Sequence, residues 1–306
     1  MTDRFTLILS AAVASTLCLA QPVTVDVRIA ARAGDTVRLR MAKIRDDANR
    51  PQSKGRSETP VEIKVMQAAP SGLVVSWKYG ATRIDRELTP AEKSILEASS
   101  QMLAKLKLEV SLDRSGAYRG LKNEADVSQV MAALIESTLE FMRMGAPDQQ
   151  KWKQLEPAIR QALSGPNQLM MITRDVQSYF GWYGARLAAG TAAASTVRLP
   201  FPLGSGQVPA TIRTKLEQAD ADKAVLTNST EYDGGVLRAM TLQFFTQILP
   251  QATAEQRKLL PSLATSEEGR AVYDRRSGWM DEVVVTRRMS LADKVKRSDV
   301  WEFRRE

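Results

Sequence analysis

Few residues in this chain could carry out nucleophilic or metal-assisted chemistry. Histidine is absent from the 306 residues, and the one cysteine is Cys18. Histidine-based triads and histidine metal ligands are therefore excluded, and thiolate sites are excluded once residue 18 is removed. No serine lies in a G-x-S-x-G turn or three residues before a lysine, the spacings that activated serines use. The sequence predicts no metal site and no cofactor.

Carboxylates are the remaining candidates for acid–base chemistry. The pair Glu267–Glu268 and the pair Asp281–Glu282 are adjacent in sequence, and neighbours on a strand point to opposite faces of a sheet. Such neighbours cannot act as a paired acid and base. The Asp220-x-Asp222 spacing resembles the start of a calcium loop, but the later ligands are missing, so a turn is the better interpretation. We therefore expect a protein without catalytic residues, and a hydrolase built from distant carboxylates stays an open alternative.

The densest aromatic cluster provides candidate ligand-binding residues. Tyr179, Phe180, Trp182 and Tyr183 follow a helical pattern, and methionines lie upstream. Flexible methionine beside aromatic rings can line an adaptable apolar pocket. Burial in the core is the favoured interpretation, because most aromatic clusters stabilise the fold. The residues that we predict to bind a ligand, if a pocket forms, are Met142, Met170, Phe180, Trp182 and Tyr183.

The N-terminal segment predicts export. Arg4 precedes an apolar run over 5–20 that ends in Cys18-Leu19-Ala20. This order is typical of a signal peptide, and sixteen residues are short for a membrane span. We expect cleavage after Ala20 and a periplasmic or secreted protein. The mature chain, from 21 to 306, is predicted to form a single domain without a transmembrane segment, and halves at 21–190 and 191–306 stay open.

The charge pattern suggests a basic surface without a nucleic-acid site. The formal net charge is +8 and the pI is about 9.6. The arginine pairs 275–276, 287–288 and 304–305 are scattered, whereas nucleic-acid binders usually cluster their basic residues. No nucleic-acid partner is predicted. A solvated basic surface, or contact with anionic components of the cell envelope, explains the charge.

The first half of the chain alternates between strands and helices. Period-2 patterns predict strands over 23–29, 37–41, 61–65 and 73–79, and a polar loop over 45–59. A capping box at Thr89 to Glu92 predicts a helix to about 105. Strands over 106–112 and 117–121 follow. Apolar residues spaced by three and four then predict helices over about 126–144, 148–163 and 167–180. Leu134 is expected in the core, and so is Phe141 if the helices and the sheet close fully on each other.

The second half begins with a segment rich in proline and glycine over 199–209, which we expect to be irregular. Strands are predicted over 210–218, 224–232, 270–273, 279–289 and 294–303. Helices are predicted over 236–249 and in a short segment ending near Pro261. The fold class is therefore α+β: an antiparallel, curved sheet with helices packed on one face.

Two hairpins in this pattern resemble each other. The segments 110–118 and 272–279 each contain a strand, an Asp-Arg-Ser-Gly type of turn and an aromatic residue, and each follows a strand pair and a helix. Two explanations stay open: a two-fold pseudo-repeat of strands, helix and hairpin, or independent use of common turn residues. In either case both halves could contribute to one continuous sheet.

The C-terminal third resembles a family of uncharacterised exported, periplasmic bacterial proteins. The likeness rests on the Pro/Gly-rich segment 199–209, the Leu-Glu-x-x-Asp turn at 216–220, the hairpin 273–279 and the last strand at 299–304. The order of sheet and helices is also similar to periplasmic lipid-carrier folds, in which a curved sheet wraps helices. These resemblances imply a fold and transfer no catalytic residues.

Two functions follow as hypotheses. The first is non-catalytic binding of an apolar small molecule, a lipid or an envelope protein between sheet and helices. The second is a structural or interaction protein of the envelope, for which an exposed apolar patch would be the evidence.

Overall fold

The computed structural model describes residues 23–48, 54–145, 148–164, 166–201, 206–248, 263–291 and 294–306. The predicted signal peptide, with its cleavage site after Ala20, and the predicted short helix near Pro261 lie outside these residues.

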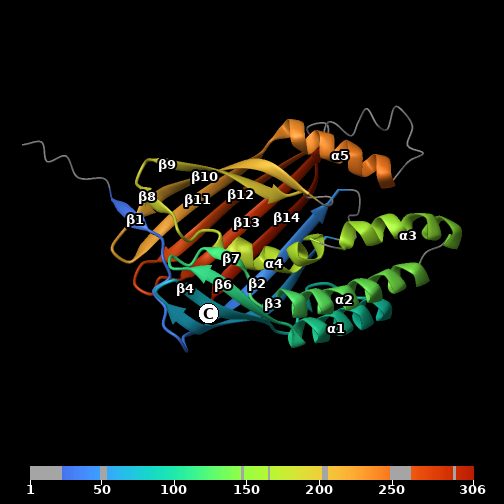
Figure 1. The fold of residues 1–306 in the computed structure, drawn as a ribbon, viewed down its shortest axis with the longest axis horizontal. Coiled ribbons are helices and arrows are strands. Elements are labelled where there is room, and N and C mark those ends of the chain that lie inside the picture. The colour runs from blue at the N-terminus through green and yellow to red at the C-terminus, as the bar shows by residue number, and fades with distance from the viewer. Residues whose placement is uncertain are drawn as a thin grey trace, which may run out of the picture.

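Five helices and fourteen strands are present in the described residues (Figure 1). The helices are α1 (Pro90–Lys105), α2 (Glu124–Met144), α3 (Gln149–Leu163), α4 (Pro166–Phe180) and α5 (Gly234–Ile248). The strands of the first half are β1 (Thr24–Asp26), β2 (Thr36–Asp47), β3 (Gly55–Ala69), β4 (Gly72–Tyr79), β5 (Arg83–Ile84), β6 (Lys107–Asp113) and β7 (Tyr118–Leu121). Those of the second half are β8 (Arg186–Ala188), β9 (Ala192–Pro200), β10 (Gln207–Ala219), β11 (Lys223–Tyr232), β12 (Leu263–Asp274), β13 (Met280–Leu291) and β14 (Lys294–Arg305).

One large antiparallel sheet joins the two halves of the chain. Its strand order is β7-β6-β4-β3-β2-β14-β13-β12-β11-β10-β9, with β5 paired to β3. Each half contributes a meander, and the two meanders meet where β2 pairs with β14. The predicted α+β class and the continuous sheet are confirmed. Figure 1 shows the sheet twisting around α4, while α1, α2, α3 and α5 gather toward one end.

The two halves also repeat the same order of elements. In the first half β3, β4, α1, β6 and β7 occur in this order, with the two-residue β5 between β4 and α1, and β4 pairs with β6. In the second half β10, β11, α5, β12 and β13 follow one another, and β11 pairs with β12. The structure therefore contains the pattern of strands, helix and hairpin twice.

The predicted loop over 45–59 is wrong at both of its ends. Residues 45–47 belong to β2 and residues 55–59 to β3, and Arg45 pairs with Gly55 across the two strands. Polar residues occupy these ends because they form ion pairs there, as between Arg56 and Glu58 at 2.9 Å. Hydrophobic alternation could not identify strand ends that are held by ion pairs. Residues 49–53 lie outside the described residues.

The predicted irregular segment over 199–209 also needs correction. Leu199 and Pro200 end β9, and residues 207–209 begin β10. Prolines are compatible with these positions because β9 is an edge strand, paired with β10 alone among the described strands, and Pro209 lies near the start of its strand. The sequence also gave no signal for the alanine-rich strand β9.

One face of the sheet, the inner face, packs on α4 and forms the main core. Across five neighbouring strands a row of fully or nearly fully buried apolar residues lies in register: Leu226, Ala271, Val283, Phe303 and Met41. Leu134 of α2 packs against this core as predicted, with its side chain half-buried. Phe141, by contrast, is 37% exposed, so its predicted place in the core is wrong. It lies in the last turn of α2, beyond the edge of the sheet (Figure 1).

The two similar hairpin turns both pack against one extended segment, residues 27–30. Gly116 and Gly278 have φ of 98° and 72°, a conformation that favours glycine. A Cβ at Gly116 would lie 2.6 Å from Ile29, and a Cβ at Gly278 would lie 2.4 Å from the backbone nitrogen of Ala30. The hydroxyl of Tyr273 also donates to the carbonyl of Arg28 at 2.7 Å. The N-terminal segment thus connects the two halves of the sheet.

The aspartates that organise these turns predict loss of stability in acid. Burial raises the pKa of Asp113, but hydrogen bonds from Ser115, Ala117 and Arg119 outweigh it and lower this pKa from 3.8 to about 2. The pKa of Asp274 is lowered in the same manner. A depressed carboxyl pKa stabilises the fold above the unfolded value, and that contribution is lost as the pH falls through the folded value. For Asp113 it is worth about 2 kcal/mol.

We therefore expect Asp113→Asn to lower the free energy of unfolding at pH 6 by up to about 2 kcal/mol, and by much less at pH 2. Urea unfolding of the wild type and the variant at both pH values measures this difference. A penalty that is the same at pH 6 and pH 2 would contradict the role of the ionised carboxylate.

Candidate functional site

The structure places the predicted ligand-binding residues in different environments. Phe180, Trp182 and Tyr183 are at most 4% exposed and belong to the main core. The rings of Phe180 and Tyr183 are brought together, with centroids 6.0 Å apart. Met170, on α4, is half-buried, and Met142, near the end of α2, is 40% exposed. The favoured interpretation of the aromatic cluster as core is confirmed, and a ligand-binding role for these five residues stays a prediction.

Protein groups satisfy the polar atoms of this aromatic cluster. The hydroxyl of Tyr179 donates to the carbonyl of Met280 at 3.2 Å, and the backbone nitrogen of Met280 donates to the hydroxyl of Tyr183 at 3.1 Å. Trp182 Nε1 donates to the carbonyl of Ser178. Burial raises the pKa of Tyr183 well above its ordinary value, so the phenol stays neutral. The two tyrosines fasten the end of α4 to β13.

Along the strands, the inner face changes from apolar to charged. Two residues beyond the apolar row that contains Phe303, the inner face carries Val285, Trp301 and Lys43 in register. Two residues further it carries Glu267, Arg287, Asp299 and Arg45, one on each of four neighbouring strands. Residues two apart on a strand share a face, so these charged side chains lie on the same side as the core.

At one end of this charged row is the arginine cluster, which consists of Arg174, Glu267, Arg287 and Tyr232. Arg287 pairs with one oxygen of Glu267 at 2.7 Å, and Arg174 approaches the other oxygen at 3.6 Å. The hydroxyl of Tyr232 donates to Glu267 at 3.1 Å. The guanidinium of Arg174 also lies 4.2 Å from the ring centroid of Trp301, where a cation–π interaction stabilises it.

The electrostatics of the arginine cluster favour negative charge. Burial, and then the like charge of Arg287, lower the pKa of Arg174 to about 10. Burial raises the pKa of Glu267, but the two arginines outweigh it and keep this pKa below its ordinary value. Burial and the charge of Glu267 raise the pKa of Tyr232 to about 12. At neutral pH the cluster therefore holds two positive charges, one negative charge and one neutral phenol.

Two further ion-pair groups surround this cluster on the inner face. Asp299 is held by Arg45 at 3.0 Å and by Arg297 at 2.7 Å. Asp175 of α4 is held by Lys43 at 2.8 Å, and the buried hydroxyl of Tyr79 donates to it at 3.3 Å. Arg45 and Arg297 carry two positive charges against the single negative charge of Asp299. An excess of positive charge therefore lies here as well as at the arginine cluster.

Sequence reasoning missed the arginine cluster, although one signal for it was present. Glu267 and Glu268 were expected to point to opposite faces, and they do: Glu267 contacts Arg287, while Glu268 contacts Arg288 at 2.7 Å. Two adjacent acids that face two adjacent bases on a neighbouring strand must form one pair on each face. Which face is buried depends on the strand register and on α4, which the sequence did not specify.

Helix α5 provides an apolar surface beside the cluster. Its fifteen residues contain one charged side chain, Arg238. Leu237 packs with Tyr232 and β10 in a small apolar cluster, against which Phe244 also packs. On the outward side Leu242 is 39% exposed and Phe245 is half-buried, and residues three apart on a helix are neighbours. The outward side also exposes Arg238, Gln243 and Thr246, so Leu242 and Phe245 form a narrow apolar strip between polar side chains.

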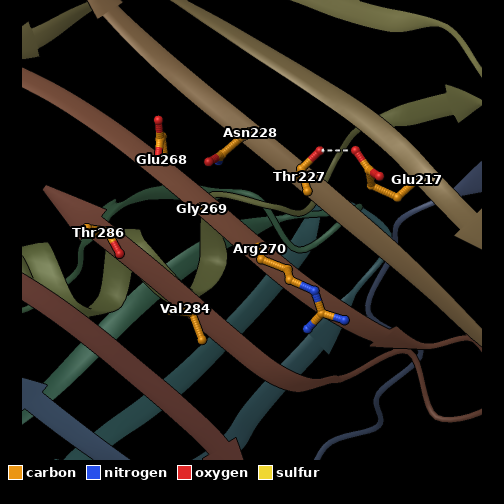
Figure 2. Close-up of a pocket in the computed structure, with 8 residues that line it drawn as sticks. All are labelled: Glu217, Thr227, Asn228, Glu268, Gly269, Arg270, Val284 and Thr286. Carbon is orange, nitrogen blue, oxygen red and sulfur yellow. Dashed lines mark hydrogen bonds between the residues drawn. The ribbon is translucent and has the colours of Figure 1, made fainter.

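Two surface hollows lie elsewhere. Figure 2 shows the first, which has a volume of about 430 Å³. The hydroxyl of Thr227 donates to Glu217 there at 3.0 Å, and the side chain of Arg270 extends along the strands. It is lined by Glu217, Thr227, Asn228, Glu268, Gly269, Arg270, Val284 and Thr286. The second, of about 830 Å³, lies beside β2 and the end of β14 and is lined largely by polar groups. In each hollow, polar lining groups already bond to one another. Neither hollow therefore indicates what kind of ligand it could bind.

Acid–base catalysis finds no support in the carboxyl groups. A general acid at neutral pH needs a carboxyl group with a raised pKa. Among the described residues, every carboxyl group with a resolved shift has a lowered pKa instead; these groups are Asp113, Glu140, Asp220, Glu267 and Asp274. The described residues contain no cluster of three metal-ligating side chains. Within the same residues, no helix combines the length and apolar character that crossing a bilayer requires.

No family model and no curated protein matches the chain, so the resemblance to exported bacterial proteins stays a prediction. Among solved structures, one similar chain comes from work titled "Lipid-protein interactions in lipovitellin". The TM-score is 0.43 and the sequence identity is 9%, and the likeness covers 90% of this chain but only 25% of the lipovitellin chain. At this level of similarity the match carries no argument about function.

Proposed function

We propose that the protein binds an apolar ligand without catalysis, and that the ligand lies on the outward face of α5. The observation that carries this proposal is the composition of α5, with one charge in fifteen residues and with Leu242 39% exposed. Burying such a surface is favourable by about 25 cal/mol per Å² of apolar area. An exported location is part of the proposal and is supported by the apolar run over 5–20.

The α5 surface differs from the apolar core in being reachable. Phe180 and Trp182 are closed in by the sheet and by α4, so a ligand could contact them only after the core opens. Leu242 and Phe245 need no such opening, because their side chains already reach the surface or lie close to it. A binding site on α5 is therefore compatible with a fully packed core.

Leu242→Gln tests the proposal. We expect the variant to bind Nile red, an uncharged apolar dye, about fourfold more weakly than the wild type. The amide takes the place of apolar surface whose burial is worth at least one methylene group, about 0.8 kcal/mol. A fluorescence titration measures the dissociation constant. Met66→Gln is the matched control, because Met66 is 41% exposed on β3. Equal dye affinity in the wild type and both variants would overturn the proposal.

Docking of a protein partner is a second candidate function. The last turn of α2 exposes Phe141 by 37%, Met142 by 40% and Met144 by 67%. An apolar patch of this kind can serve as an interaction surface, and methionine adapts to different partners. If the partner is a second copy of the chain, sedimentation velocity should detect concentration-dependent association that Met142→Gln with Met144→Gln abolishes. A wild type that stays monomeric at every concentration would rule out self-association.

A further inference from the structure

The arginine cluster has one positive charge more than its own carboxylate can balance. Arg174 and Arg287 share Glu267, one on each carboxylate oxygen. Tyr232, the fourth member, carries no charge and uses its hydroxyl proton on the same carboxylate. Uncompensated charge at a partly desolvated position is unfavourable, and an additional anion would relieve it.

The cluster also contains an unused hydrogen-bond donor. Arg287 Nε is buried and, in the part of the chain that the structure describes, has no hydrogen-bond partner. The Arg287 side chain is 12% exposed and that of Arg174 is 29% exposed, so the group is desolvated but not sealed. A buried donor without a partner is costly, and a guanidinium is suited to bidentate binding of a carboxylate or a phosphate.

The cluster adjoins the inward side of α5, the helix whose outward side carries the proposed apolar site. Tyr232, which contacts Glu267, packs in the same small cluster as Leu237 of α5. On the other side, Trp301 under Arg174 belongs to the main core. A positively charged group between two apolar surfaces matches a molecule that has an anionic head and an apolar chain.

We infer that Arg174 and Arg287 bind the carboxylate or phosphate headgroup of an amphiphile whose chain lies on α5. This inference rests on the proposed function, because α5 supplies the surface for the chain. The headgroup would accept hydrogen bonds from the guanidinium of Arg287, including its free Nε, and would balance the second arginine. Glu267 keeps the two arginines in place and limits the excess to a single charge.

The test compares two probes that share a chain and a fluorophore and differ in the charge of the headgroup. Dansylaminoundecanoic acid carries a carboxylate, and its methyl ester is neutral with the same chain. We expect the wild type to bind the acid about tenfold more tightly than the ester, because hydrogen bonds to charged groups are the strong ones. Arg287→Gln should abolish this preference and leave the affinity for the ester unchanged.

Arg288→Gln is the matched control. Arg288 follows Arg287 on β13, lies on the outer face and pairs with Glu268 at the same distance of 2.7 Å. This variant should keep the preference for the acid. If Arg287→Gln does not fold, as shown by circular dichroism, Arg174→Gln replaces it and should lose the preference in the same way. A preference for the acid that survives in the folded arginine variant overturns the inference.

The remaining outcomes separate the two proposals. Equal binding of acid and ester by the wild type would overturn the headgroup site and leave the apolar site on α5 standing. Binding of neither probe would overturn both. Calorimetry with inorganic phosphate alone distinguishes the source of the anion, and we expect no measurable binding of phosphate to the wild type. A different result would assign the site to a free oxyanion: phosphate binds, Arg287→Gln removes this binding, and the wild type shows no preference for the acid probe.

Discussion

Replacing Phe180 by alanine is expected to lower the free energy of unfolding by about 3–5 kcal/mol, the usual range for a fully buried phenylalanine. The ring is 0% exposed and lies between Trp77, at 6.0 Å, and Tyr179, at 5.1 Å between centroids. Its loss would leave a cavity at the point where α4 contacts the sheet. Urea unfolding followed by tryptophan fluorescence measures the change.

Phe141→Ala is the control for this prediction. Phe141 has the same side chain at an exposed position of α2, so its truncation should cost well under 1 kcal/mol, as surface substitutions usually do. The comparison also tests whether Phe180 lines a binding pocket. A small stability loss in Phe180→Ala, together with weaker uptake of an apolar dye, would mean that the aromatic cluster is a pocket and would contradict a closed core.

Gly278→Ala is expected to lower the free energy of unfolding by about 3 kcal/mol or more, from two separate causes. The residue has φ of 72°, where a Cβ is unfavourable by itself. The added atom would also lie 2.4 Å from the nitrogen of Ala30 and 2.8 Å from the carbonyl oxygen of Arg28. Both are backbone atoms, so neither can move aside by a change of rotamer.

Gly190→Ala separates the two causes. Gly190 has a similar φ of 77°, but a Cβ there would meet no atom within 4 Å. It should therefore show the backbone strain alone, roughly 1–2 kcal/mol. If thermal unfolding gives equal losses for the two variants, the close contact between the hairpin turn and residues 28–30 does not contribute to stability.

The sequence predicted those parts of the fold that depend on local pattern. The capping box at Thr89 and the apolar spacing of α2 and α4 predicted these helices nearly to their observed bounds. The Asp-Ser-Gly turns predicted both hairpins, because aspartate and glycine have specific roles there. What these patterns could not predict is that both turns contact the same segment, since that depends on how the two meanders meet at β2 and β14.

The candidate site was harder to predict for the same reason. Glu267, Arg287 and Arg174 are far apart in the chain and are charged, and charged residues in strands are usually exposed. Their burial follows from the strand register and from the position of α4 over β13 and β14. The exposure of Phe141 was missed because the apolar spacing of α2 continues past the edge of the sheet that the helix covers.

Native mass spectrometry of the protein isolated from its own cells tests the central claim, non-catalytic binding of an amphiphile, most directly. We predict a species whose mass exceeds that of the chain by one amphiphilic molecule, and its partial or complete loss in Leu242→Gln but not in Met66→Gln. The account is contradicted if the isolated wild-type protein carries no such molecule and also binds none after incubation with oleate.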